Sequence, residues 1–138
     1  MNRLKYWLSA KTVYHLHSPY LYQLYGEVLG PRLSRRTRIR LRPPRRYRQY
    51  HEEVYKLSNH FQVPCECVTD NECQFTLPDG SQIAVVRAPH RNKGAEQHWR
   101  QRQQEQLWRV SLDMYDVGVL LSNPRLSRQQ IVLKRWGW

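Results

Sequence analysis

The sequence predicts a small α/β protein in which a mixed sheet has flanking helices. Apolar residues recur at helical spacing in two segments, residues 18–31 and 49–61. From Cys65 onward the apolar period changes to that of strands, and the turn sequences Thr69-Asp70-Asn71 and Pro78-Asp79-Gly80 separate the first strand-like runs. With 138 residues, the chain is long enough to bury a hydrophobic core as a single domain.

The N-terminal segment, residues 1–31, is predicted to be helical. A short helix is expected over residues 3–16, where apolar side chains recur. A second helix begins at Ser18-Pro19, because serine is a preferred N-cap and proline fits the first helical position. Gly30-Pro31 ends this helix, since neither residue favours its continuation.

The body, residues 49–138, begins with a helix over residues 49–61. A polar helix is expected over residues 92–107, with Ala95 and Trp99 as its core contacts. The predicted strands cover residues 65–69, 73–77, 82–87, 110–114, 117–121 and 131–133. In the fourth strand, Ser111 and Asp113 alternate with apolar residues and are therefore expected to face outward.

Almost all of the excess positive charge lies in the first third of the chain. The formal net charge is +12, and residues 1–48 hold 12 basic residues against one acid. Residues 32–48 alone hold nine arginines, no lysine and no acid, and Pro43-Pro44 interrupts regular structure. This segment is therefore predicted to be an extended basic arm that is attached to a near-neutral body.

An arginine-rich arm favours a nucleic-acid partner. Arginine makes bidentate phosphate contacts and stacks on bases, which lysine does less well. At a membrane surface lysine would serve as well as arginine, so the absence of lysine in this segment favours folded RNA. An acidic protein, a membrane surface or a solvated arm are the alternatives. A second basic segment, residues 89–94, lies at the start of the predicted helix and suits a phosphate contact, although a solvated loop is an equally good interpretation. The predicted nucleic-acid-binding residues are Arg32, Arg35, Arg36, Arg38, Arg40, Arg42, Arg45, Arg46, Tyr47, Arg48, His90, Arg91 and Lys93.

The cysteine count and the apolar runs bear on location. Three cysteines leave one thiol unpaired in any disulfide scheme, which indicates a reducing compartment and a cytoplasmic protein. The N-terminus lacks the apolar stretch of a secretory signal, and the longest apolar run, residues 117–121, is too short to span a membrane. We therefore expect no membrane partner.

The spacing of the cysteines predicts no metal site. Cys65 and Cys67 lie two apart on a predicted strand, so their sulfur atoms should be roughly 7 Å apart, too far for one zinc ion. Buried free thiols are therefore favoured over a zinc cluster of His60, Cys65, Cys67 and Cys73.

Two sequence blocks occur in an order that is known from other proteins. The first is HSPYLY at residues 17–22, and the second contains APHRNKG at residues 88–94 and VSLDMYDVGVLL at residues 110–121. Together they resemble a bacterial family of class I S-adenosylmethionine-dependent methyltransferase-like proteins, and the resemblance covers about half of the chain. It implies a degenerate Rossmann-like remnant that has lost the cofactor-binding half of the family's fold.

The sequence also argues against catalysis. Cofactor loops of this fold need closely spaced glycines, and no two of the six glycines are separated by a single residue. Arg87-Ala88 replaces the family's acidic pair at a strand end. No Ser/His/Asp or Cys/His arrangement can be assembled from the spacing. We therefore expect no catalytic residue, no cofactor and no enzyme activity.

The sequence thus predicts a non-enzymatic, RNA-binding structural protein. It would be a component of a ribonucleoprotein such as the ribosome, or stably associated with one, and would contact rRNA through the arm and neighbouring proteins through its body. A methyltransferase-like enzyme, or an inactive accessory subunit of one, is the first alternative. A protein–protein adaptor that uses the aromatic N-terminal helices is the second.

Overall fold

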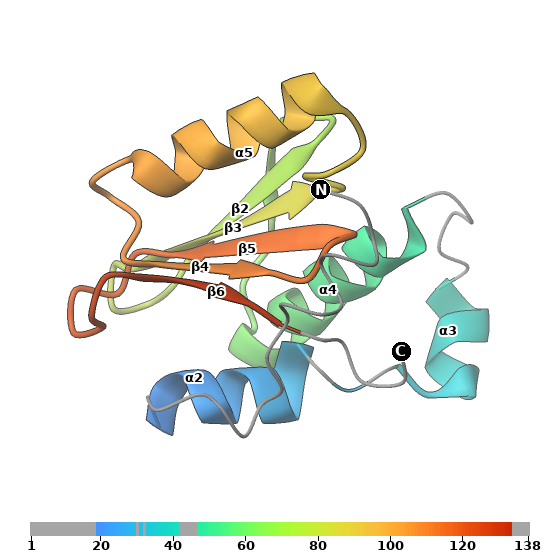
Figure 1. Cartoon of the computed structure of the whole chain (residues 1–138). Helices are drawn as coiled ribbons and strands as arrows, with labels where there is room; N and C mark the ends of the chain where they lie inside the picture. Colours follow the sequence, from blue (N-terminus) through green and yellow to red (C-terminus); the bar gives the residue numbers. More distant parts are fainter. Residues whose placement is uncertain (1–18, 30, 32, 42–46, 134–138) are drawn as a thin grey trace.

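The computed structural model describes residues 19–29, 31, 33–41 and 47–133, in which a six-stranded sheet lies between helices (Figure 1). The helical elements are α2 (Pro19–Leu24), the π-helical turn η2 (Tyr25–Leu29), α3 (Arg35–Leu41), α4 (Arg48–Phe61) and α5 (Lys93–Gln104). The strands are β1 (Glu66–Thr69), β2 (Glu72–Thr76), β3 (Gln82–Arg87), β4 (Val110–Asp113), β5 (Val117–Leu121) and β6 (Gln129–Val132). The small mixed sheet with flanking helices that the sequence predicts is therefore confirmed.

The sheet has the strand order β1-β2-β3-β5-β4-β6. The pairs β1–β2, β2–β3, β3–β5 and β5–β4 are antiparallel, and β4 and β6 are parallel. Because β5 lies antiparallel between β3 and β4, those two strands run in the same direction. Helix α5 connects them, so their carboxyl ends, Arg87 and Asp113, reach the same edge of the sheet.

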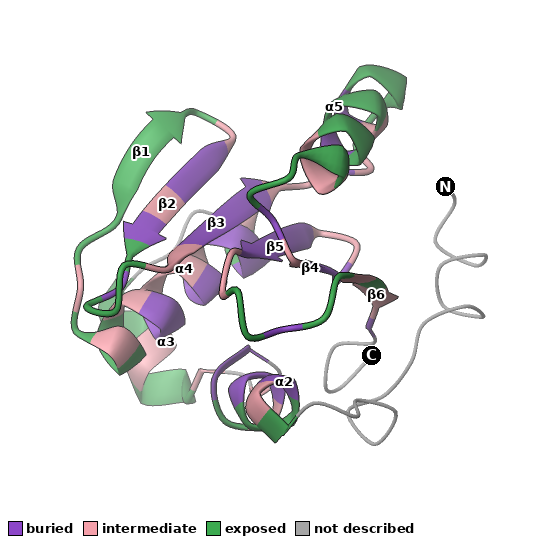
Figure 2. Ribbon diagram, turned by 90° about the vertical axis from the view of Figure 1, so that its left-hand side faces the viewer, coloured by how far each residue is buried: buried purple, intermediate pink, exposed green. Residues whose placement is uncertain are grey.

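Both faces of the sheet are covered, which makes a three-layer structure (Figure 1). On one face, Ala84, Val86 and Leu120 pack with Trp99 of α5 and with Trp108. On the other face, strand residues share a larger core with α2, η2 and α4. Figure 2 shows the buried residues concentrated in the central strands and the exposed residues on β1 and the outer side of α5.

The N-terminal helical stripe is confirmed. Leu21, Leu24, Tyr25 and Val28 are all buried, and they belong to the same core as the strands. The segment over residues 19–29 thus packs into the body. The helix expected over residues 3–16, and the two C-terminal tryptophans, lie outside the described residues.

The extended arm predicted over residues 32–48 is wrong where the structure describes it, because residues 35–41 form helix α3. Ser34 begins this helix: its Oγ accepts a hydrogen bond from the backbone N–H of Thr37 at 3.2 Å. Arginine is itself a good helix former. Arg38 also finds a countercharge in Glu52 of α4, with 2.9 Å between Nε and Oε1. Arg32 and residues 42–46 lie outside the described residues.

The outward orientation expected for Ser111 and Asp113 is also wrong, since all four residues of β4 are buried. The reason is that α5 and the loop before it cover the face to which these side chains point. Gln103 of α5 donates a hydrogen bond to Ser111 Oγ at 2.9 Å. Alternation therefore does not mean exposure in a sheet that is covered on both sides.

The remaining elements occur where the sequence predicts them, although α5 ends three residues before its predicted end and β6 begins two residues before its predicted start. Helix α4 begins one residue before its predicted start, and β3 and β5 have the expected bounds. Ala95 and Trp99 of α5 are buried as expected. Within the described ranges, no helix has the length and apolar character that crossing a membrane requires.

Candidate nucleic-acid interface

A hollow of about 560 Å³ lies at the edge of the sheet where β3 and β4 end. Three segments that are distant in the sequence line it. They are residues 47–49 at the start of α4, Ala88, His90 and Arg91 after β3, and Tyr115 and Asp116 between β4 and β5. In α/β proteins, ligands bind outside the carboxyl ends of strands, because the loops that follow them diverge there. The position of this hollow makes it the leading candidate site.

The backbone around this hollow is strained. Tyr47, Ala88 and Tyr115 have left-handed backbone angles, with φ values of 62°, 43° and 68°. In the described part of the chain they are three of the four non-glycine residues with positive φ. Each such conformation costs on the order of 1–3 kcal/mol, and strain of this kind gathers at ligand sites.

Local contacts hold two of the strained residues in place. The Ala88 N–H donates to the Asp116 carbonyl at 2.9 Å, which ties the two loops together. The Arg87 guanidinium lies 3.9 Å from the centroid of the Tyr47 ring, a cation–π contact between β3 and the start of α4. Specific contacts therefore connect the segments that line the hollow.

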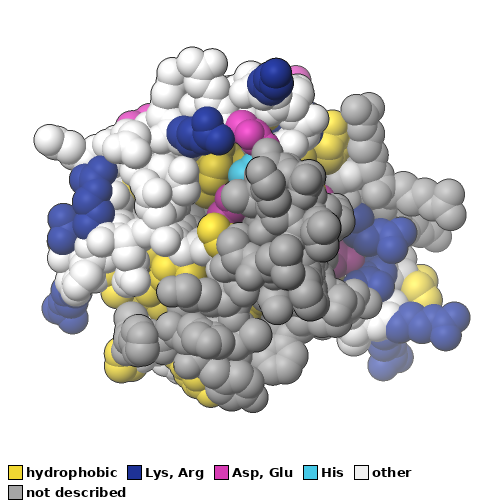
Figure 3. Space-filling view, in the orientation of Figure 1, with side chains coloured by type: hydrophobic (Ala, Val, Ile, Leu, Met, Phe, Trp, Pro, Cys, Tyr) yellow, Lys and Arg dark blue, Asp and Glu magenta, His cyan; other side chains and the backbone are white. Residues whose placement is uncertain are grey.

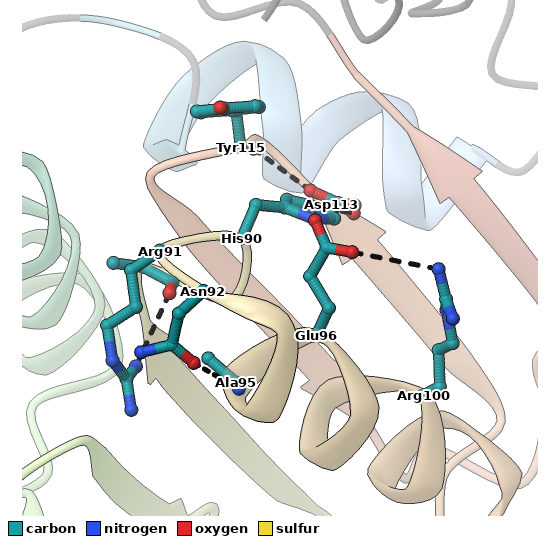
Figure 4. Close-up of polar contacts among 9 residues, drawn as sticks. His90, Arg91, Asn92, Ala95, Glu96, Arg100, Asp113 and Tyr115 are labelled. Carbon is teal, nitrogen blue, oxygen red and sulfur yellow. Dashed lines mark hydrogen bonds and ion pairs between the residues drawn. The ribbon is translucent and has the colours of Figure 1, made fainter. Parts of the chain in front are cut away.

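His90, which lines the hollow, is the centre of a charged cluster with Glu96 and Asp113 (Figure 4). The His90 side chain is only 7% exposed; its Nε2 lies 2.6 Å from Asp113 Oδ2 and its Nδ1 lies 3.1 Å from Glu96 Oε1. Its ring stacks on Tyr115, with 5.3 Å between the centroids. Only the protonated imidazole can donate to both carboxylates at once. When it is protonated, His90 therefore links Glu96 of α5 to Asp113 of β4 through its two ring nitrogens.

Burial by itself lowers the pKa of His90, but hydrogen bonds and charges from Asp113 and Glu96 outweigh it. The net pKa of His90 is raised above its ordinary value of 6.5. The proton on His90 is therefore bound more tightly in the folded protein than in the unfolded chain. The stabilisation is fully present below pH 6.5 and is lost as the pH rises through the raised pKa.

We expect the free energy of unfolding to fall as the pH rises above about 6.5, and His90→Gln to flatten this dependence. Urea unfolding between acidic and mildly alkaline pH measures the effect. The matched control is His98→Gln, which changes an exposed histidine on α5, the helix that follows the His90 loop. An identical pH dependence in His90→Gln and the unmodified protein would contradict the assignment.

The three predicted basic residues after β3 are placed differently: His90 and Arg91 lie in the loop between β3 and α5, and Lys93 begins α5. His90 is turned inward to the two carboxylates, whereas Arg91 and Lys93 are exposed. Arg91 Nη1 donates to the carbonyls of Arg87 and Ala88 at 2.9 and 3.3 Å, and it lines the hollow. Asn92 caps α5 by accepting a hydrogen bond from the Ala95 N–H at 2.8 Å.

Helix α3 carries four of the five described arginines of the predicted arm, and the fifth, Arg48, begins α4. Arg35, Arg36 and Arg40 are exposed, and Figure 3 shows basic side chains gathered on that side of the molecule. Arg38 reaches α4 at Glu52, one turn after Arg48. The arginines of α3 do not line the hollow, whereas Tyr47, Arg48, His90 and Arg91 do. The other predicted residues, Arg32, Arg42, Arg45 and Arg46, lie outside the described residues.

Sequence reasoning missed the acidic and aromatic members of this region. Asp113, Tyr115 and Asp116 all follow the apolar part of β4, and Glu96 stands one turn into α5. Their position in the sequence could have identified them, because polar residues at the carboxyl end of a buried strand are well placed to reach a site. The alternation of polar and apolar residues in β4 instead suggested that Asp113 faces solvent.

The predicted cysteine geometry is wrong as well. The sulfur atoms of Cys65, Cys67 and Cys73 all lie within 4.8 Å of one another, instead of being spread along a strand. Only Cys73 is buried, whereas Cys65 and Cys67 are exposed. Cys65 precedes β1, so the strand period does not apply to it, and Cys73 belongs to the neighbouring strand.

Comparison with protein-family models, curated proteins and solved structures finds no match to this chain. The relationship to methyltransferase-like proteins therefore stays a prediction. The fold and the site define a three-layer α/β protein with a strained hollow at the strand ends and an arginine-bearing helix close to it.

Proposed function

We propose that the protein binds RNA as a non-catalytic, structural part of a cytoplasmic ribonucleoprotein such as the ribosome, with rRNA as the contacted RNA and neighbouring proteins as further partners. The observation that carries this proposal is the display of arginine on α3. This helix has seven residues, four of which are arginine; it contains no acid, and none of its residues is buried. Such a surface suits the phosphate backbone of a nucleic acid.

The electrostatics of α3 are unfavourable without a polyanion. Arg36 and Arg40 stand at i and i+4, where like charges repel. Arg35 and Arg36 occupy the first turn, where the helix dipole disfavours cations. Glu52 compensates Arg38. A row of phosphates would relieve the remaining repulsion, which favours RNA over a neutral partner.

The hollow extends this basic surface along α4. Arg38 contacts α4 at Glu52, and Arg48 and Tyr47 lie one turn earlier at the mouth of the hollow. Arg48 and Arg91 offer phosphate contacts there, while the rings of Tyr47 and Tyr115 offer surfaces on which bases stack. We infer that the RNA backbone follows α3 and that an unpaired nucleotide enters the hollow.

The salt dependence of RNA binding tests the proposal. With six to nine phosphate contacts, the slope of log K against log salt is expected to be roughly −4 to −8. Filter binding or fluorescence anisotropy with structured rRNA fragments at several salt concentrations measures it. A slope shallower than about −2 would exclude the arginine-rich segment as the binding element.

A matched pair of double variants locates the contact. Arg36→Gln/Arg40→Gln removes two exposed charges from α3 and spares Arg38, which holds α4. It should flatten the slope by about two, since each lost phosphate contact reduces it by about one. The control, Arg100→Gln/Arg125→Gln, removes two exposed charges elsewhere and should leave the slope unchanged. Equal effects of both pairs would show that only net charge matters.

A methyltransferase-like remnant is the second candidate, favoured by one feature of the topology. The unit β3–α5–β4 joins two strands of the same direction through a helix, as in Rossmann-type sheets, and the hollow lies beyond the ends of those strands. Four of the five strand pairings are antiparallel, however, whereas a cofactor-binding half is built from parallel strands. We propose that such an ancestry survives only in β3–α5–β4.

Cofactor binding separates the two candidates. We expect no saturable binding of S-adenosylmethionine at millimolar concentration by isothermal titration, because closely spaced glycines are lacking and His90 is already paired with Asp113 and Glu96. Saturable binding accompanied by methyl transfer to an RNA would favour the enzyme instead.

A further inference from the structure

The three cysteines form a cluster that the RNA-binding proposal does not use. Cys67 and Cys73 are directly opposite each other in the β1–β2 ladder, and their sulfur atoms are 3.5 Å apart. Cys65 stands just before β1, and the sulfur atoms of all three lie within 4.8 Å of one another. A chain turn and a cross-strand pair thus bring together thiols that sequence spacing alone would separate.

We propose that Cys65, Cys67 and Cys73 form a three-thiolate site for a thiophilic metal ion, Zn²⁺ or Cu⁺. Thiolates are the ligands that both ions prefer. Around a tetrahedral zinc ion with sulfur at about 2.3 Å, neighbouring sulfur atoms lie about 3.8 Å apart. The three sulfur atoms therefore need to move by no more than about 1 Å to reach that geometry.

The surroundings of Cys73 support a ligand role. The Tyr50 hydroxyl donates a hydrogen bond to Cys73 Sγ at 2.8 Å, which is the kind of contact that orients a metal-bound thiolate. A bound cation would replace the proton on this sulfur and compensate the charge of the thiolate within the core.

The coordination number points to an open position. Among the described residues, no histidine or carboxylate joins the three thiols in the cluster. Zn²⁺ would complete its tetrahedron with a water molecule, whereas Cu⁺ is satisfied by soft sulfur ligands alone. Either ion would fasten β1, which is an exposed edge strand, to the buried β2 and, through Tyr50, to α4.

Metal titration of the full chain, reduced with a phosphine under anaerobic conditions, tests the site. Co²⁺ serves as the spectroscopic probe for Zn²⁺, because thiolate-to-cobalt charge transfer gives a near-ultraviolet band that Zn²⁺ then abolishes. Competition with a Cu⁺ chelator measures the affinity for Cu⁺. We expect one metal ion to bind per chain in at least one of the two titrations, and the ion with the higher affinity is then identified as the ligand.

Single substitutions decide whether all three thiols take part. Cys65→Ser and Cys67→Ser change exposed residues and should each abolish one-to-one binding. Tyr50→Phe should weaken binding about 10–100-fold, as loss of a ligand's hydrogen-bond partner does. Val68→Ser, on the exposed strand β1, is the control and should bind normally. Stoichiometric binding that survives Cys65→Ser, or a reduced protein that binds neither ion, would overturn the proposal.

Discussion

Replacing Lys56 by methionine is expected to lower the free energy of unfolding by about 3–5 kcal/mol, as breaking a buried ion pair does. The Lys56 ammonium is 2.7 Å from Glu53 Oε1, and the two side chains are 9% and 0% exposed. The same ammonium donates to the carbonyls of Leu29 and Pro31, both at 2.8 Å. Lys56 therefore fastens the end of η2 to α4, and methionine keeps its bulk while removing every one of these contacts.

Urea unfolding of Lys56→Met measures this loss, and Lys93→Met is the matched control because Lys93 is exposed. The double variant Glu53→Gln/Lys56→Met should lose less than the sum of the two single variants, since neighbouring partners couple. Hydrogen exchange should accelerate first in α2 and η2, which the ammonium holds in place. Equal stability of Lys56→Met and Lys93→Met would contradict the structural role of this lysine.

The second large effect is expected at the centre of the layer between α5 and the sheet. Trp99 is 2% exposed and packs on Ala84, Val86 and Leu120, so Trp99→Ala should cost about 3–5 kcal/mol. Leu107→Ala is the control, because Leu107 is half exposed and its truncation should change stability by less than about 0.5 kcal/mol. Comparable losses in the two variants would mean that α5 is not anchored by its tryptophan.

The close approach of Gly118 to the Trp99 ring allows a second test of how α5 packs on the sheet. A Cβ atom added at Gly118 would lie 2.5 Å from Cη2 of Trp99, so Gly118→Ala should destabilise by about 1–3 kcal/mol through overpacking. In the Trp99→Phe background, a smaller ring leaves room for that methyl group. The cost of Gly118→Ala should therefore shrink, and an unchanged cost would show that the clash lies elsewhere.

Much of the secondary structure could be predicted from the sequence alone, because it follows from the conformational preferences of short segments. The stripe through Tyr50 and Leu57 predicts α4 because residues at that spacing share one helix face. Pro78-Asp79-Gly80 predicts the turn between β2 and β3, where Gly80 adopts a φ of 88°. The basic loop before α5 was also predicted, including a helix start that Asn92 now caps. Each of these preferences acts within a few residues of the chain.

Helix α3 and the inward orientation of Asp113 were not predicted from the sequence, because both depend on residues that are distant in the chain. Glu52 on α4 supplies a countercharge that sequence reasoning over residues 32–48 does not contain. Asp113 points inward because α5 covers the face of β4 that alternation assigns to solvent, and His90 meets it there. Coverage by another layer is a property of the assembled fold.

Tertiary structure alone decided the two candidate sites. The hollow exists because β5 lies between β3 and β4, which brings the ends of those strands to one edge beside the start of α4. The thiol cluster exists because Cys67 and Cys73 are paired across two strands while Cys65 stands outside the ladder. Composition and periodicity state which side chains are available and which elements bear them. Strand order and register decide which of them meet, since both are set by the packing of the whole core.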